Sequence, residues 1–175
     1  MKKIYIILTH TGTILSRIIK TYTKDEFSHV SIALDNELKE MYSFGRLNPY
    51  NPFIGGFIHE YLNKGTFKRF VKTRAKIIEL EIDDKQYNEL KHIISEFKKS
   101  YNIYKFNVIG LFAAGFNIKI KREKYFYCAE FVKYVLEKSN INLKLPEIIK
   151  PESFKQIIRG KTVYRGILQE YTVNS

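Results

Sequence analysis

The chain has 175 residues, and its 45% hydrophobic and 15% aromatic residues are enough to fill the core of a single domain spanning residues 1–175. Thirty Lys and Arg against 18 Asp and Glu give a net charge of +12, which favours contact with nucleic acid, anionic lipid headgroups or acidic polymers. A single cysteine excludes an intramolecular disulfide. The first apolar run is too short for a secretion signal and no stretch reaches membrane-spanning length, so we expect a cytoplasmic protein.

The first part of the chain predicts a strand, a helix and a hairpin of two further strands. Residues 3–8 form a continuous apolar run typical of a buried strand, and residues 13–22 carry an apolar stripe at helical spacing. Residues 28–34 alternate apolar and polar side chains, as a half-buried strand does. A turn at 35–36 lets residues 37–44 return antiparallel to it, which completes the hairpin.

The rest of the chain predicts an irregular loop followed by further strands and helices. The loop covers residues 45–64, where prolines and a Gly-Gly pair interrupt every periodic pattern. The later elements are a strand at 77–82, a helix N-capped by Asp83 or Asp84, a short buried helix within 107–116, a helix beginning at Cys128, a short helix at 152–158 and a last strand at 162–171. This order predicts an α+β fold in which helices cover an antiparallel sheet.

Cys128, the only cysteine, begins a helix whose apolar stripe continues through Phe131, Val132, Val135 and Leu136. Its sulfur therefore faces the protein. The unpaired backbone N–H groups of the first helical turn favour a thiolate over a thiol. A free cysteine of this kind is also a common core residue, so its position alone leaves a structural role open.

The predicted hairpin offers a second group of polar side chains. With the turn at 35–36, Ser31 lies opposite Glu40 and His29 lies opposite Tyr42, and all four share one face. Thiol-dependent acyl transfer needs a thiolate, an imidazole that moves the proton, and a polar group that orients the imidazole. Cys128, His29 and Glu40 supply these three residue types. A histidine or a carboxylate on a strand is also a common structural or solvated residue.

These residues carry a resemblance to a known family. The segments Ser28-His29-Val30-Ser31-Ile32-Ala33-Leu34 and Tyr127-Cys128-Ala129-Glu130-Phe131-Val132, with Glu40 between them, resemble the circularly permuted branch of the NlpC-like, papain-fold cysteine peptidases and amidases, the YiiX-type proteins. In that branch the histidine precedes the cysteine, a polar residue follows on the next strand, and the cysteine begins a late helix. The resemblance covers about residues 3 to 140.

The resemblance implies a papain-like, permuted fold with assigned roles. Cys128 is the expected nucleophile, His29 the base and Glu40 the orienting residue, while Tyr42 and Ser43 are alternatives for the third position. The Cys128 backbone N–H is the expected oxyanion donor. We expect Tyr42, Tyr127 and His10 to contact substrate, because aromatic side chains can line an apolar pocket and the segment containing His10 is polar.

The expected function is that of a cysteine-dependent amidase or peptidase that forms an acyl-enzyme on Cys128. Its substrate is a small peptide, an amide or a lipid-like molecule, and it needs no cofactor. The alternatives are an acyl hydrolase or acyltransferase acting on lipid, as in the similar lecithin:retinol acyltransferase-like proteins, and a non-catalytic basic protein. The +12 charge supports peripheral contact with anionic membrane, whereas nucleic acid is a weaker expectation because no nucleic-acid motif occurs. The histidines and cysteine lack metal-ligand spacing, so no metal site is expected.

Overall fold

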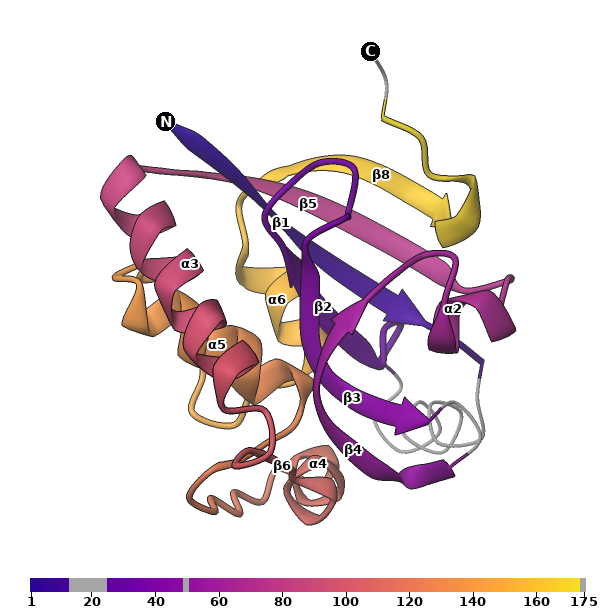
Figure 1. Cartoon of the computed structure of the whole chain (residues 1–175), viewed down its shortest axis with the longest axis vertical. Helices are drawn as coiled ribbons and strands as arrows, with labels where there is room; N and C mark the ends of the chain where they lie inside the picture. The colour runs from indigo at the N-terminus through magenta and orange to yellow at the C-terminus, as the bar shows by residue number, and fades with distance from the viewer. Residues whose placement is uncertain (13–24, 49–50, 174–175) are drawn as a thin grey trace.

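The computed structural model describes residues 1–12, 25–48 and 51–173. Within these ranges, six strands form one antiparallel sheet in the order β4-β3-β2-β1-β5-β8 (Figure 1). The strands are β1 (Lys2–His10), β2 (His29–Ala33), β3 (Met41–Asn48), β4 (Asn51–Glu60), β5 (Arg74–Ile82) and β8 (Lys161–Ile167). The fold is α+β with an antiparallel sheet, as predicted. The helix predicted at 13–22 lies outside the described residues.

Helices and loops cover both faces of the sheet. Helices α3, α5 and α6 cover one face, where they pack on Ile4, Ile6 and Leu8 of β1 (Figure 1). Tyr5 and Ile7 point to the other face, which is covered by α2 and the short helix η1. The helices are α2 (Gly65–Arg69), α3 (Asp84–Lys99), α4 (Val108–Gly115), α5 (Cys128–Lys138), α6 (Pro151–Ile157) and the 3₁₀ helix η1 (Leu168–Glu170). Burial on both faces explains why β1 is a continuous apolar run.

The predicted start of α3 is confirmed. Asp83 is its N-cap: the Asp83 carboxylate accepts a hydrogen bond of 2.7 Å from the Gln86 backbone N–H. In return, the Gln86 side chain accepts one of 3.1 Å from the Asp83 N–H. This reciprocal capping box satisfies two backbone donors that the first turn leaves without helical partners.

The pairing of β2 with β3 differs from the predicted hairpin. The predicted register pairs Ile32 with Lys39, whereas the structure pairs Ile32 with Tyr42, a displacement of three residues. Because side chains alternate along a strand, an odd displacement exchanges the two faces of the returning strand. Glu40 and Tyr42 therefore lie away from the face that carries His29.

The prediction of an irregular loop at residues 45–64 is wrong. This segment contains the end of β3, the whole of β4 and Lys64, the N-cap residue of α2. Strand β4 pairs with β3 from Met41 opposite Glu60 to Asn48 opposite Asn51. Proline and glycine are depleted in strands, so their presence hid this one. An edge strand tolerates them, and β4 is at the edge of the sheet.

A pair of two-residue strands joins α4 to the start of α5. Strand β6 (Lys105–Phe106) runs parallel to β7 (Tyr125–Phe126). The buried Asn107 side chain caps α4 by accepting a hydrogen bond of 3.0 Å from the Gly110 N–H. The predicted helix within 107–116 is confirmed, but it is not buried throughout, because Ile109 and Phe112 are 57% and 38% exposed.

Candidate active site

Cys128 is the first residue of α5 and is 3% exposed. The predicted apolar stripe that follows it is buried completely against the sheet. Glu130 fixes the start of the helix, because its carboxylate accepts a hydrogen bond of 3.1 Å from the Tyr127 backbone N–H. Burial raises the pKa of Glu130, although this hydrogen bond opposes the shift. Glu130 thus positions the helix turn that carries the thiol.

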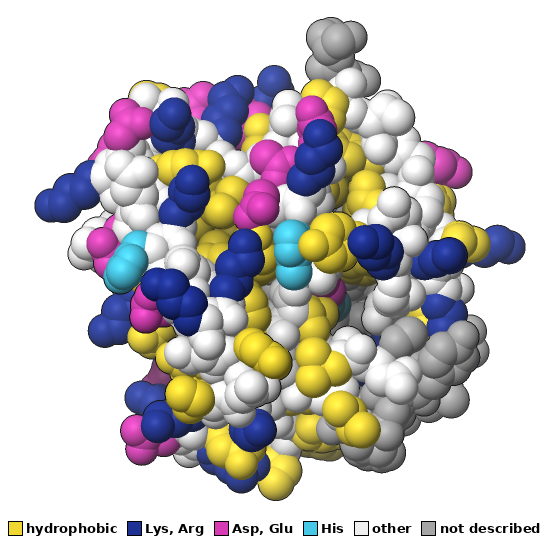
Figure 2. Space-filling model, in the orientation of Figure 1, with side chains coloured by type: hydrophobic (Ala, Val, Ile, Leu, Met, Phe, Trp, Pro, Cys, Tyr) yellow, Lys and Arg dark blue, Asp and Glu magenta, His cyan; other side chains and the backbone are white. Residues whose placement is uncertain are grey.

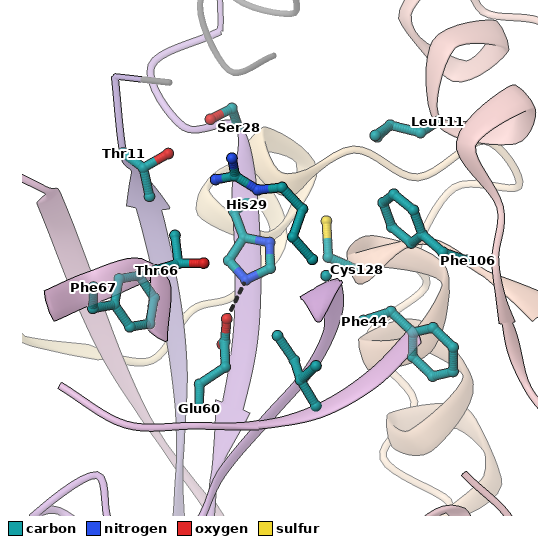
Figure 3. A pocket seen from close by; sticks show the side chains of 13 residues that line it. Thr11, Ser28, His29, Phe44, Glu60, Thr66, Phe67, Phe106, Leu111 and Cys128 are labelled. Atoms are coloured by element: carbon teal, nitrogen blue, oxygen red, sulfur yellow. Dashed lines mark hydrogen bonds and ion pairs between the residues drawn. The ribbon is translucent and has the colours of Figure 1, made fainter. Parts of the chain in front are cut away.

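His29, the first residue of β2, lies between Cys128 and Glu60. Its Nε2 atom is 3.0 Å from Oε1 of Glu60, and Nδ1 is on the side of the ring that faces the Cys128 sulfur (Figure 3). Ser31 Oγ lies 3.3 Å from the same Nε2 atom and donates a short hydrogen bond to the second oxygen of Glu60. One oxygen of the Glu60 carboxylate thus contacts His29 and the other accepts from Ser31, and this arrangement fixes the orientation of the imidazole.

Glu60 reaches His29 across β3, the strand that separates β4 from β2. On this face β3 presents the small residues Ser43 and Gly45. A Cβ atom added at Gly45 would lie 3.5 Å from Cε1 of His29 and 3.0 Å from the side chain of Ile58. Met41, the β3 residue paired with Glu60, is on the same face, but the small residues Ser43 and Gly45 that follow it leave space for the carboxylate to reach His29.

The environment of His29 favours the protonated imidazole. Burial by itself lowers the pKa of His29, but the Glu60 carboxylate and the Cys128 side chain raise it to about 10 through charge and hydrogen bonding. His29 is therefore an imidazolium at neutral pH. A proton held in this position is available to a group bound beside Cys128.

The three side chains line one cleft (Figure 3). Its walls combine aromatic and aliphatic residues, including Phe44, Phe106 and Leu111, with the hydroxyl groups of Ser28 and Thr11. A cysteine sulfur, an imidazolium and a carboxylate in a mostly apolar cleft can add to a carbonyl group and protonate its leaving group.

The structure does not bring Glu40 to this site. Glu40 is exposed, accepts a short hydrogen bond from Tyr42, and lies 3.6 Å from the ammonium group of Lys98. The Asp35 carboxylate accepts a hydrogen bond of 2.7 Å from the Glu40 backbone N–H and so closes a loop longer than the predicted turn. This longer loop produces the register that separates Glu40 from His29.

The alternatives for the third position also lie elsewhere. Tyr42 is fully buried, and its ring packs against Phe57 and His59 on the face away from His29. Ser43 is on the same face as His29, but its hydroxyl donates a hydrogen bond of 2.6 Å to the Val30 carbonyl. Neither residue orients the imidazole.

Neither of the other two expected substrate contacts is among the residues that line this cleft. The Tyr127 hydroxyl donates a hydrogen bond of 2.9 Å to the Ile149 carbonyl, and its ring is buried in the core. His10 Nδ1 lies 3.3 Å from Ser28 Oγ, and Ser28 lines the cleft. His10 is therefore a neighbour of the cleft, whereas Tyr127 is a core residue.

Sequence reasoning missed Glu60. The sequence offers no strand signal here, because Phe57 and Ile58 are both apolar and His59 and Glu60 are both polar, so apolar and polar residues do not alternate. The neighbouring Gly55-Gly56 pair opposes a strand as well.

Within the described parts of the chain, no group of His, Cys, Asp and Glu side chains is arranged to hold a metal ion. None of the helices in those parts is long and apolar enough to cross a membrane. Comparisons of the chain with protein-family models, with curated proteins and with solved structures find no match.

Proposed function

We propose that the protein is a cysteine-dependent hydrolase that attacks an amide or ester carbonyl through Cys128. The observation that carries the proposal is the position of His29, between the Cys128 sulfur and the Glu60 carboxylate at the wall of one cleft. Nucleophile, proton carrier and orienting carboxylate are the parts that covalent thiol catalysis requires. We propose Glu60 in the role that the sequence resemblance assigned to Glu40.

In the acylation step, the Cys128 thiolate bonds to the carbonyl carbon and the carbonyl electron pair moves to oxygen. The backbone N–H of Cys128 donates to this oxyanion. Collapse of the intermediate breaks the bond to the leaving amine or alcohol, which takes the proton of the His29 imidazolium. The product of this step is a thioester on Cys128.

Deacylation reverses the roles of the groups. The thioester carries no negative charge on sulfur, so one of the causes that raise the pKa of His29 disappears. The imidazole then accepts a proton from water as the water oxygen bonds to the thioester carbon. The carbon–sulfur bond breaks, the carboxylic acid leaves, and the thiolate–imidazolium pair is restored.

We also propose that the fold belongs to the permuted papain-like type. The supporting observations are the chain order, with His29 on β2 and Cys128 at the start of the late helix α5, and the packing of this helix on an antiparallel sheet. One feature departs from the expected pattern, because Glu60 lies on β4 and not on the strand that directly follows His29.

A lipid substrate, or an acyl acceptor other than water, uses the same chemistry. The aromatic and aliphatic walls of the cleft, formed in part by Phe106 and Leu111, are compatible with an acyl chain as well as with a peptide side chain. Parallel assays with p-nitrophenyl esters of increasing chain length and with amino-acid anilides distinguish these substrate classes.

Replacing Cys128 with alanine is expected to reduce hydrolysis of the preferred ester or anilide on the order of a thousandfold, to the uncatalysed rate. Initial rates are measured for the two proteins at equal concentration, with thermal melting as the check that both are folded. Hydrolysis that persists in Cys128→Ala would refute the assigned nucleophile.

A second candidate function, binding to an anionic membrane, is favoured by one exposed surface. Ile109 and Phe112 of α4 and the nearby Ile118 are 57%, 38% and 56% exposed, and the exposed basic segment at 119–124 follows them. Figure 2 shows hydrophobic and basic side chains together at the lower edge of the molecule, where Figure 1 places α4. Apolar side chains beside lysine and arginine are typical of proteins that rest on anionic lipid.

This surface predicts sedimentation with phosphatidylserine vesicles but not with phosphatidylcholine vesicles at moderate salt. The Ile109→Ser and Phe112→Ser variants are expected to reduce sedimentation severalfold, whereas Val71→Ser, which changes another exposed apolar residue, is the matched control. Equal sedimentation with both kinds of vesicle would contradict a lipid-specific surface. The same conclusion would follow if added duplex DNA abolished sedimentation with phosphatidylserine vesicles while the two serine variants still sedimented as the wild type does.

A further inference from the structure

The cleft contains a positive charge that the proposed chemistry does not use. Arg46 lies on β3 and pairs with Gly55 of β4, directly before a shift in the register of the two strands. Such irregularities redirect a side chain out of the regular alternation and are frequent beside active sites. Arg46 is half-buried and lines the same cleft as Cys128 and His29.

No carboxylate of the described residues lies within ion-pair distance of Arg46. Glu60, the acidic residue of this cleft, is engaged by His29 and Ser31. The Arg46 guanidinium instead lies 5.8 Å from the centre of the Phe70 ring. A half-buried cation without a counter-ion costs stability, and such costs are characteristic of binding sites.

A second guanidinium lies nearby. Arg69 is positioned over the same Phe70 ring at 5.2 Å. Burial and the positive charge of Arg69 both lower the pKa of Arg46. An anion bound at Arg46 would offset the repulsion between the two guanidinium groups and restore part of the solvation that burial removes.

Arg46 also lines two neighbouring hollows. The first is the cleft at Cys128, and the second is lined by Lys64 and Tyr61 among other residues. Arg46, Glu60 and Thr66 are among the residues that line both. Arg46 therefore lines the cleft in which a ligand reacting at Cys128 would lie.

We propose that Arg46 binds an anionic group of the substrate, a carboxylate or a phosphate, while the scissile carbonyl lies at Cys128. This inference rests on the proposed thiol chemistry. A guanidinium group suits the role because its planar N–H donors can form two parallel hydrogen bonds with either anion. Arg46 thus selects acidic amides or esters over neutral ones.

Two alkylating reagents test this proposal without knowledge of the natural substrate. Iodoacetate and iodoacetamide both form a bond between the Cys128 sulfur and their methylene carbon, with loss of iodide, but only iodoacetate carries a negative charge. The ratio of their rate constants cancels every effect that is common to both reagents. Arg46→Gln is expected to lower the ratio of iodoacetate to iodoacetamide rates about tenfold, the size of a single charge interaction in a partly buried site.

Two further variants serve as controls. Lys68→Gln removes one positive charge from α2 at a residue that does not line either hollow, so the ratio should remain as in the wild type. Arg46→Lys keeps the charge and should retain most of the ratio. An unchanged ratio in Arg46→Gln would overturn the proposal. An equal decrease of the ratio in Lys68→Gln would also overturn it, because the ratio would then report a general effect of the +12 net charge.

A protection assay identifies the kind of anion. Stronger slowing of iodoacetamide alkylation by inorganic phosphate than by succinate supports a phosphate-bearing substrate, and the reverse order supports a carboxylate. Protection by neither anion contradicts a built site. Failure of the proposed thiol chemistry is distinguishable from failure of the Arg46 proposal. If the thiol chemistry is wrong, the rate of alkylation by iodoacetamide does not depend on His29.

Discussion

Replacing His29 with glutamine is expected to slow the alkylation of Cys128 by iodoacetamide about a hundredfold at a pH of about 6.5. At that pH an isolated thiol is only about one per cent thiolate, and the thiolate is the form that reacts. In the proposed mechanism the imidazolium of His29 forms an ion pair with the sulfur of Cys128, and the imidazolium remains protonated because the pKa of His29 is raised to about 10.

The pH dependence gives this prediction a second readout. The wild-type alkylation rate should change little between a pH of about 6.5 and about 8.5, since the ion pair persists over this range. In His29→Gln the rate should rise about tenfold per unit pH until an ordinary thiol has ionised. Glutamine is preferred to alanine because its amide can still donate to the buried Glu60 carboxylate, which would otherwise be left without a partner. Equal rates and equal pH profiles for the two proteins would refute the ion pair.

Replacing Glu60 with glutamine is expected to lower turnover by about a hundredfold or more at neutral pH, whereas Glu40→Gln should change it by less than about twofold. Glu60 contacts Nε2 of His29 at 3.0 Å, while Glu40 is exposed and engaged with Tyr42 and Lys98. The pair of variants therefore compares the same chemical change inside and outside the site. A decrease in Glu40→Gln that equals the decrease in Glu60→Gln would contradict the assignment.

The Glu60 variant should also shift the alkaline limb of the pH–rate profile. Turnover needs the His29 proton for the leaving group, so wild-type activity should fall as pH rises through about 10. Glutamine removes the charge that raises the pKa of His29, and the limb should move to lower pH by roughly one to three units.

The stability of the folded protein should depend on pH in the same direction as its activity. The raised pKa contributes stability that is fully present below 6.5 and is lost as pH rises through about 10. The difference in melting temperature between wild type and Glu60→Gln should therefore shrink at alkaline pH.

Local patterns were sufficient to predict most elements of the fold. The stripe after Cys128, the N-cap at Asp83 and the apolar run of β1 each express one strong rule, and each appears in the structure where the sequence indicates it. Strand β4 was not predictable in this way, since proline and the Gly55-Gly56 pair oppose strand propensity and the strand is stabilised by its pairing with β3.

The candidate site was predictable only in part, for a related reason. Cys128 and His29 each begin an element that the sequence marks clearly, and the structure brings them together. The third residue depended on the register of β2 with β3, which the Asp35 loop sets. A displacement by an odd number of residues placed Glu40 on the wrong face. The side chain that meets His29 comes from β4, two strands away, and only the twisted sheet determines which side chain reaches that far.

In the proposed reaction Cys128 carries the acyl group during turnover. The most direct test mixes the protein with a slight excess of p-nitrophenyl acetate, quenches the reaction in acid within the first turnover, and locates the acetyl group by mass spectrometry of the intact chain and of its peptides. We expect one acetyl group on Cys128 in the wild-type protein, slow acetylation in His29→Gln, and none at this position in Cys128→Ala. Acetylation confined to lysines, or acetylation of Cys128 at the same rate with and without His29, would contradict the proposed reaction.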